Sequence, residues 1–221
     1  KLGDILYTFT EYSQRKIIPT IAFKKWINTT NLIQYLGVHY IDIVRFVTGG
    51  TPLRVSAVGQ KIFLKQKKIN THDSIQLNIE WIDKYNNYFN QTIMLNWIDP
   101  NHSTAMSDQK IKFVCTKGRF ELDQKERGIK IITDKNHLTE PNPDFCKMYG
   151  HEKGKYYWQG YGIDSIKTFL SDLRLLKQNK KKIKDLELIR PSFFEGLVST
   201  AVIESANKSL KKKGIWVPIK Y

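Results

Sequence analysis

The chain has few of the signals that mark a membrane, secreted or redox-active protein. No apolar run approaches the roughly 20 residues that a membrane span needs, and the first residues lack the apolar core of a signal peptide. Only two cysteines occur, Cys115 and Cys146. In so few copies they favour two buried thiols over a disulfide or a redox pair. These absences predict a cytoplasmic protein.

Common catalytic and metal-binding motifs are missing too. No GxGxxG follows a predicted strand, and no GxSxG marks the nucleophile of a hydrolase. His72, His102, His137 and His151 show no spacing with Cys, Asp or Glu that suggests a metal site, apart from the adjacent pair His72 and Asp73. Adjacent side chains of a strand point to opposite faces, so this pair is a poor ligand set. We therefore predict no metal ion.

Acidic residues are scarce relative to basic ones, which leaves a formal net charge of +15. Such an excess raises the hypothesis of a nucleic-acid-binding protein. However, 29 of the 36 basic residues are lysine, and arginine, which reads bases and phosphates better, is scarce. The run KQNKKKIK follows one predicted helix as a solvated connection, and Lys211 to Lys213 precede Gly214 in a last helical turn, where cations suit the helix dipole. Nucleic-acid binding is therefore the weaker interpretation.

Length and composition favour one domain, because 221 residues, 41% of them hydrophobic, suffice for a single covered core. Apolar residues alternate with polar ones from Ile75 to Trp81, which predicts a strand. Further strands are predicted over Ile5 to Tyr12, Arg54 to Phe63, Thr92 to Trp97, Lys110 to Thr116, Arg119 to Leu122 and Ile129 to Thr133, with an antiparallel meander from Ile75 onward, and helices over Gly162 to Lys177 and Ser192 to Lys213. The expected fold is α+β, an open and mostly antiparallel sheet with helices packed on one face.

The segment Asn31 to Phe46 is predicted to be a helix with chemically capable groups along one stripe. Its polar stripe consists of Asn31, Tyr35, His39 and Asp42, whose spacing places them on one face. The neighbouring stripe, which is expected to pack into the core, consists of Leu32, Leu36, Tyr40, Ile43 and Val47. Gly37 lies inside this helix at a cost of roughly 1 kcal/mol relative to alanine, so we expect a ligand or a strand to approach the backbone there.

The run LGVHYIDIVRF, which contains His39 and Asp42, resembles the GVHxxD helix of the glucose-fructose oxidoreductase and inositol dehydrogenase family (Gfo/Idh/MocA). The resemblance extends over nearly the whole chain. KLGDILYTFTEY is similar to the first strand of the family's second domain, and FEGLVSTAVIESANKSLKKKGIWVPI is similar to its last long helix and closing strand. Members pair a Rossmann domain with this sheet-rich, substrate-binding domain. The resemblance therefore implies an α+β fold of the dihydrodipicolinate-reductase-like C-terminal type.

Two departures from the family pattern matter. Many members carry an aspartate four residues before the histidine, where this chain has Tyr35, which supplies no carboxylate near neutral pH. The Glu-Lys-Pro segment, from which the family draws its catalytic lysine and part of its cofactor contact, is absent together with GxGxxG. We therefore expect residues 1–221 to be a single substrate-binding and oligomerisation domain without its dinucleotide-binding half, and to have no turnover alone.

The resemblance makes His39, Tyr35 and Asp42 the candidate catalytic residues. A lone histidine in an amphipathic helix is more often a hydrogen-bonded core residue, but the LGVHYID context favours a site. By analogy with the family, His39 bonds the hydroxyl that is oxidised, and a lysine of the missing segment accepts the proton. Hydride would pass to NAD or NADP held by the other domain. Asp42 either orients the His39 ring or caps nearby backbone groups.

The connection between the first strand and the helix, residues 12–31, would lie over the substrate pocket if the family geometry holds. Cations in this connection suit a phosphate or carboxylate, and an indole stacks on a sugar ring. The alternative is a solvated basic loop with one anchoring tryptophan. The segment KYYWQGYG, Lys155 to Gly162, either walls the same pocket or forms a packed turn. The candidate substrate-binding residues are Arg15, Lys16, Lys25, Trp26 and Asn31.

These observations predict the C-terminal domain of a NAD(P)-dependent oxidoreductase that acts on a sugar, a sugar derivative such as a nucleotide sugar, or a polyol. No cofactor-binding residue is assigned within the chain. The expected partners are a sugar-type small molecule, the protein's own Rossmann domain and further copies of the chain that associate through the open sheet face, without a membrane. A non-catalytic homologue that binds a sugar or scaffolds an oligomer is the alternative, favoured by Tyr35.

Overall fold

The computed structural model describes residues 2–128, 130–134, 138–150, 156–187 and 189–221. The chain divides into two compact units, of which unit 1 contains Lys1–Lys125 and Phe194–Tyr221 and unit 2 contains Glu126–Phe193. Among the described residues, no helix is both long and apolar enough to cross a membrane. Because compact units need not fold independently, the single domain expected from the length stays a prediction.

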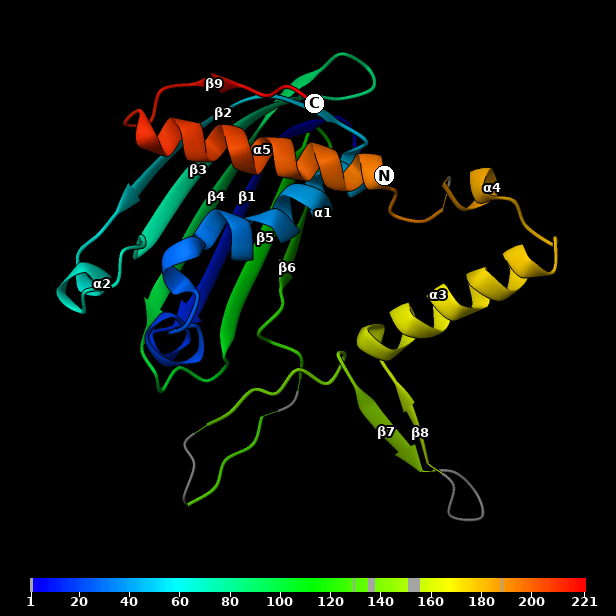
Figure 1. Ribbon diagram of the computed structural model, residues 1–221, viewed down its shortest axis with the longest axis horizontal. Helices are drawn as coiled ribbons and strands as arrows, with labels where there is room; N and C mark the ends of the chain where they lie inside the picture. Colours follow the sequence, from blue (N-terminus) through cyan, green and yellow to red (C-terminus); the bar gives the residue numbers. More distant parts are fainter. Residues whose placement is uncertain (1, 129, 135–137, 151–155, 188) are drawn as a thin grey trace. The chain divides into compact units, whose positions relative to one another are not determined.

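A seven-stranded sheet forms the body of unit 1 (Figure 1). Its strand order is β6-β5-β1-β4-β3-β2-β9. The strands are β1 (Ile5–Arg15), β2 (Thr51–Gln60), β3 (Ser74–Ile82), β4 (Tyr88–Asp99), β5 (Ser107–Cys115), β6 (Gly118–Asp123) and β9 (Val217–Pro218). Burial alternates along β3 as the sequence predicted, because successive side chains of a strand face opposite sides of the sheet.

The first strand enters the middle of this sheet. β1 pairs in parallel with β4, with Phe9 opposite Thr92, and antiparallel with β5, with Phe9 opposite Lys112. The predicted meander is therefore wrong between β4 and β5, which β1 separates. The local pattern of a strand shows which side chains are buried but not which strands supply its hydrogen-bonding partners. The other paired strands of this sheet are antiparallel, so the α+β fold with an open, mostly antiparallel sheet is confirmed.

Two strand boundaries differ from prediction. β2 ends at Gln60, and the chain then turns into the short helix α2 (Phe63–Gln66) instead of continuing as a strand to Phe63. The cause is the buried carboxylate of Asp73, which accepts hydrogen bonds from three successive backbone N–H groups at the start of this helix. In the predicted strand Ile129 to Thr133, the first residue lies outside the described residues, and Ile131 forms only an isolated bridge with Thr139.

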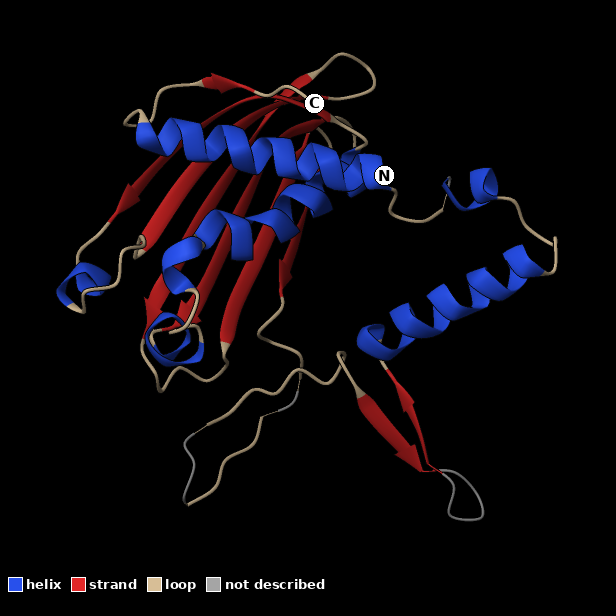
Figure 2. Ribbon diagram, viewed as in Figure 1, coloured by secondary structure: helices blue, strands red, loops and turns tan. Residues whose placement is uncertain are grey.

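Helices that pack on the sheet of unit 1 cover one of its faces, as expected (Figure 2). They are η3 (Ile33–Gly37), which has π-helical hydrogen bonding and continues into α1 (Val38–Thr48), and α5 (Phe193–Lys211). A buried network ties α1 to the strands: Gln91 on β4 donates to the Tyr40 carbonyl oxygen at 2.9 Å and accepts from the Trp81 indole at 3.1 Å. Because each polar atom in this network has a partner, the helix has a fixed position over the sheet.

The core stripe of the first helix was predicted correctly except at its last residue, and Ile43 is partly buried and packs against the core. Leu32, Leu36 and Tyr40 are buried, but Val47 is 60% exposed. Ile41 and Val44 are buried in the second half. The spacing therefore holds through the π-helical turn η3, since Tyr40 beyond it is buried, and it fails only at Val47, near the end of α1.

Gly37 is confirmed as a point of close approach. A Cβ atom added at this position would lie 3.2 Å from Cδ1 of Leu95, a buried residue of β4. The φ angle of Gly37 is −62°, which any residue adopts, so the glycine is required by space and not by backbone conformation. The neighbour that the sequence left open, ligand or strand, is therefore a strand.

Unit 2 contains a two-stranded sheet and two helices. They are β7 (Lys147–Gly150), β8 (Tyr156–Gln159), α3 (Tyr161–Lys177) and α4 (Ile183–Glu187). The helix predicted over Gly162 to Lys177 is thus confirmed, whereas the basic run KQNKKKIK, residues 177–184, ends in the first two residues of the short helix α4. Asp172 on α3 accepts a hydrogen bond from Arg190 at 2.7 Å and lies 3.7 Å from the Lys181 ammonium.

Candidate functional site

The first helix begins at an asparagine that acts as its cap. The Asn31 carboxamide oxygen accepts hydrogen bonds from the backbone N–H groups of Ile33 (2.9 Å) and Gln34 (3.2 Å). The Gln34 side chain returns a bond to the Asn31 N–H at 3.1 Å, which completes a reciprocal capping arrangement. The Asn31 amide also donates to Asn207 of α5 at 2.7 Å. Asn31 therefore fixes where the helix starts, and its contact with a substrate stays a prediction.

Tyr35, one turn further on, belongs to an aromatic cluster that also contains Phe23, Trp26 and Trp97. The Tyr35 ring centroid lies 4.7 Å from Phe23, 6.2 Å from Trp26 and 6.1 Å from Trp97. Trp97 is fully buried, and its indole N–H has no hydrogen-bond partner among the described residues. Trp26, in contrast, is 41% exposed, so the Trp26 indole is the part of the cluster that a ligand can contact.

His39 lies on the exposed side of α1, so it is not the buried, hydrogen-bonded histidine of the alternative interpretation. Its one ring neighbour among the described residues is Tyr12 of β1, with the ring centroids 6.4 Å apart. It forms no hydrogen bond or ion pair within the described part of the chain. Asp42 is exposed as well, and it too has no such partner there. Both groups are thus available to a ligand, while the orienting contact proposed between them is not formed.

The connection from β1 to the helix contains two short helical turns, η1 (Ile18–Ala22) and η2 (Ile27–Thr29). Arg15 lies at the start of this connection, and its guanidinium donates hydrogen bonds to the carbonyl oxygens of Ser103 and Ala105. The Lys16 ammonium lies 5.2 Å from the centroid of the Phe63 ring. Lys25 is exposed. Of the predicted cations, Lys16 and Lys25 therefore remain open to an anion, whereas Arg15 anchors the β4–β5 loop.

Next to Arg15, β4 ends at a partly buried acid. Burial, followed by the nearby carboxylates of Asp108 and Glu11, raises the pKa of Asp99 above its ordinary value. The backbone carbonyl of Asp99 accepts a hydrogen bond from the Lys16 N–H at 3.0 Å. This acid is therefore tied to the connection that carries the predicted substrate-binding residues.

The structure brings part of the predicted site together. Tyr35 and Trp26 share the aromatic cluster, and His39 follows on the same helix. The segment KYYWQGYG belongs to unit 2, and its first residue lies outside the described residues. Its part in the pocket stays a prediction. Sequence reasoning missed Phe23, Trp97 and Tyr12, whose aromatic character was the only signal, because their neighbours come from other elements.

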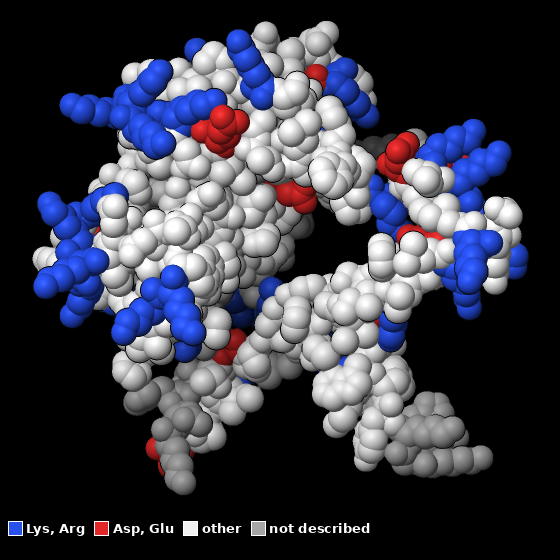
Figure 3. All heavy atoms as spheres, in the orientation of Figure 1, with Lys and Arg blue, Asp and Glu red and all other residues white. Residues whose placement is uncertain are grey.

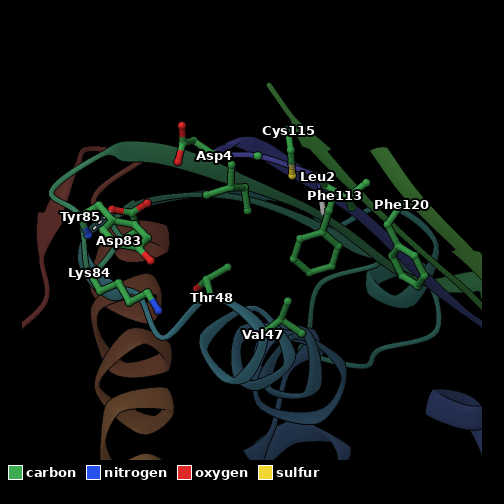
Figure 4. A pocket seen from close by; sticks show the side chains of 12 residues that line it. Leu2, Asp4, Val47, Thr48, Asp83, Lys84, Tyr85, Phe113, Cys115 and Phe120 are labelled. Atoms are coloured by element: carbon green, nitrogen blue, oxygen red, sulfur yellow. Dashed lines mark hydrogen bonds between the residues drawn. The ribbon is translucent and has the colours of Figure 1, made fainter. Parts of the chain in front are cut away.

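A cavity of about 450 Å³ opens at the other end of α1, where the helix ends and β1 begins (Figure 4). Its walls are mostly apolar and include Val47, Phe113 and Phe120, with Cys115 among them. Burial raises the pKa of the Cys115 thiol, with a smaller contribution from Asp4. Both cysteines are free and partly buried. No predicted site residue lines this cavity.

The described residues contain no group of three or more His, Cys, Asp or Glu side chains that could hold a metal ion. The sequence offers no glycine-rich turn of the kind that holds the phosphates of a dinucleotide. No residue of the chain is therefore assigned to a nicotinamide cofactor.

The fold is shared with solved dehydrogenases. Scyllo-inositol dehydrogenase from Lactobacillus casei, with bound NAD(H) and scyllo-inositol, matches with a TM-score of 0.64 and 14% identity over 98% of this chain and 57% of that chain. Myo-inositol 2-dehydrogenase from Lactobacillus plantarum matches with a TM-score of 0.64 and 12% identity over 99% and 58%. A myo-inositol dehydrogenase from Corynebacterium glutamicum matches with a TM-score of 0.60 and 14% identity over 100% and 58%. At these identities the likeness shows the fold alone.

The sequence itself identifies the family. The model of the GFO/IDH/MocA C-terminal domain matches residues 1–121, which are more than half of the chain. The chain belongs to this family, as its helix motif had indicated. It spans a little over half the length of the solved neighbours. No curated protein matches the chain in sequence.

Proposed function

We propose that the chain is the substrate-binding part of a NAD(P)-dependent oxidoreductase that acts on a sugar, a sugar derivative or a polyol. The observation that carries the proposal is the exposed His39, which has no hydrogen bond within the described chain and stands on the helix whose sequence resembles that of the family. The family membership supports it, as do neighbours that are inositol dehydrogenases. The dinucleotide would be held by a Rossmann domain outside this chain, since the chain has no glycine-rich turn of the kind that binds dinucleotide phosphates.

The residues of the chain would bind and orient the substrate. His39, with both ring nitrogens available, would accept or donate a hydrogen bond to the hydroxyl that reacts. Trp26 would stack on the ring of the sugar, because its partly exposed indole borders the aromatic cluster. Tyr35 replaces the usual carboxylate with a phenol, so it would position a hydroxyl of the substrate through a hydrogen bond. When bound, the nicotinamide would supply the hydride acceptor.

The test uses the complete protein that contains this chain. Nicotinamide absorbance is followed with a panel of sugars, sugar phosphates, nucleotide sugars and inositols. His39→Ala should lower kcat by about a hundredfold or more if His39 acts in proton transfer. Phe46→Ala, which removes an exposed side chain of the same helix, is the matched control and should leave kcat unchanged. Turnover that is unaffected by His39→Ala would refute the assignment of the site.

A non-catalytic homologue is the second candidate function, and Tyr35 is the observation that favours it. Where relatives place a carboxylate, Tyr35 packs into an aromatic cluster with Phe23 and Trp97. Such a protein would bind NAD or a sugar without turnover. In the same assay, tight binding of nicotinamide by calorimetry, together with no absorbance change on any substrate, would establish this function and exclude the dehydrogenase.

The open face of the sheet is proposed to join copies of the chain. Side chains of β1 and β4 on this face remain uncovered: Tyr7 is 46% exposed, Phe9 is 40% and Met94 is 37%. Exposed aromatic and apolar groups of this kind favour a protein interface. Light scattering at tens of micromolar should give an oligomer, and Phe9→Lys should shift it toward the monomer, whereas Phe46→Lys on α1 should not. A monomeric unmodified chain would contradict the proposal.

A further inference from the structure

The connection between β2 and β3 forms an open hollow of about 410 Å³ on the surface, and four of its five lining residues are exposed. Three of its five lining residues are lysines, and none is acidic; the five are Lys61, Lys65, Lys68, Ile69 and Asn70, here called the lysine pocket. It includes part of α2, and basic side chains gather at the edge of unit 1 where this helix lies (Figure 3).

The backbone beneath the lysine pocket is held in place from several sides. Asp73 fixes the start of α2 by accepting hydrogen bonds from the N–H groups of Phe63 at 2.7 Å and Leu64 at 2.8 Å. The Asn70 N–H donates to the Asn28 side chain of η2 at 3.0 Å. Lys68 has a φ angle of +61°, a left-handed conformation that few residues other than glycine adopt. The three lysine side chains therefore start from a defined frame.

The positive charge in the lysine pocket is not neutralised within the described part of the chain. Lys65 and Lys68 form no ion pair there, and the Lys61 ammonium donates only to the amide oxygen of Asn70, at 3.0 Å. The neighbouring carboxylate, Asp73, is buried and already bonded to backbone N–H groups. Since like charges repel when they share one hollow, an anion bound among them would lower the electrostatic free energy.

His72 lies close enough to Lys61 and Asp73 for both charges to act on it, with opposite effects on its pKa. Burial, followed by the charge of Lys61, lowers the pKa of His72 below its ordinary value. The ammonium groups of Lys16 and Lys67 lie 5.2 and 5.8 Å from the centroid of the Phe63 ring of α2. Lys67 on the same turn and Lys16 on the connection that carries Trp26 thus add cations to the three of the lysine pocket.

We propose that the lysine pocket binds a phosphate oxyanion of a small molecule. Each ammonium group is a point charge with three donors, which suits the several oxygens of a phosphate, and the amide of Asn70 adds a neutral donor. The volume falls in the range of small-ligand sites, which favours a phosphorylated metabolite over a macromolecule. The anion comes either free, as phosphate or pyrophosphate, or as the phosphate group of a larger ligand that also reaches Trp26 and His39.

The test titrates the isotope-labelled full chain with inorganic pyrophosphate and follows backbone amide resonances. Resonances from Lys61 to Asn70 should move and saturate. Changing Lys61, Lys65 and Lys68 together to glutamine should weaken binding by about tenfold or more, because it removes the charged donors. Changing Lys211, Lys212 and Lys213 together to glutamine is the matched control: it removes the same charge, and Lys213 also has a left-handed φ, of 58°. This control should bind like the unmodified chain.

Two results would overturn the proposal: equal weakening in both triple variants, which would show only a response to net charge, or shifts that do not saturate in the pocket. A second arm compares glucose 6-phosphate with glucose. Shifts confined to residues 61–70 would identify a free-phosphate site, whereas additional shifts at Trp26 and His39 would identify the phosphate group of a larger ligand. Both arms are independent of dehydrogenase activity, so a failed activity assay would not decide them.

Discussion

Asp73 should contribute more to stability than any exposed carboxylate of the chain. Its side chain is 3% exposed and accepts hydrogen bonds from the N–H groups of Ile62, Phe63 and Leu64. In Asp73→Ala, the buried N–H of Leu64 loses its partner completely, at roughly 1–3 kcal/mol, and the other two regain water in part. These unpaired N–H groups and the lost helix cap together should lower the free energy of unfolding of Asp73→Ala by about 3 kcal/mol.

The assay is urea unfolding followed by circular dichroism. Asp73→Asn keeps one acceptor oxygen, so it should fall between the unmodified chain and Asp73→Ala. Glu204→Ala serves as the control, because Glu204 pairs with Lys208 on the exposed surface of α5, and such a pair contributes about 0–1 kcal/mol. If Asp73→Ala lowers the free energy of unfolding no more than Glu204→Ala does, the capping role is refuted.

Three further outcomes are expected. Gly37→Ala should gain about 1 kcal/mol in helix propensity but lose about 1–3 kcal/mol to overpacking against the buried Leu95, so urea unfolding should show a net loss; a gain would show that Leu95 moves aside. Because the pKa of Asp99 is raised in the folded chain, its ionisation makes stability fall as pH rises through and above about 4. Asp99→Asn should therefore raise the melting temperature at pH 7 but not at pH 2.5, and equal shifts at both would contradict this. In a Cys146→Ser background, the rate of Cys115 alkylation should reach half its maximum at a higher pH than that of a free thiol, since burial raises the pKa of Cys115; an equal or lower midpoint would count against its burial.

Much of the fold could be predicted where the deciding pattern is local. Alternation from Ile75 to Trp81 predicted β3, and the helical spacing of Leu32, Leu36 and Tyr40 predicted which side of the first helix is buried. The prediction became wrong at Val47, near the end of α1, because the spacing of apolar residues does not show where along a helix the packing against the sheet ends.

The candidate site was predictable in part. His39 and Asp42 were found from the helix motif, and both are exposed and available. Arg15 was predicted to bind a substrate anion, but the β4–β5 loop returns beside it and offers two carbonyl oxygens. The residues near Arg15 in the sequence do not predict its hydrogen bonds to these carbonyl oxygens, because the loop that supplies them lies about 90 residues further along the chain. The structural role of Asn31 as a helix cap, by contrast, follows from its position before an apolar periodic segment.

The sequence by itself determined the family, the α+β class and the helix that carries His39, since motif, period and capping are encoded by residues close along the chain. The tertiary structure alone decided that β1 lies between β4 and β5, that Tyr35 packs among Phe23 and Trp97, and that lysines of one short turn share a hollow. These features depend on contacts between residues far apart in sequence, whose partners are selected by the packing of the whole sheet and not by any local propensity.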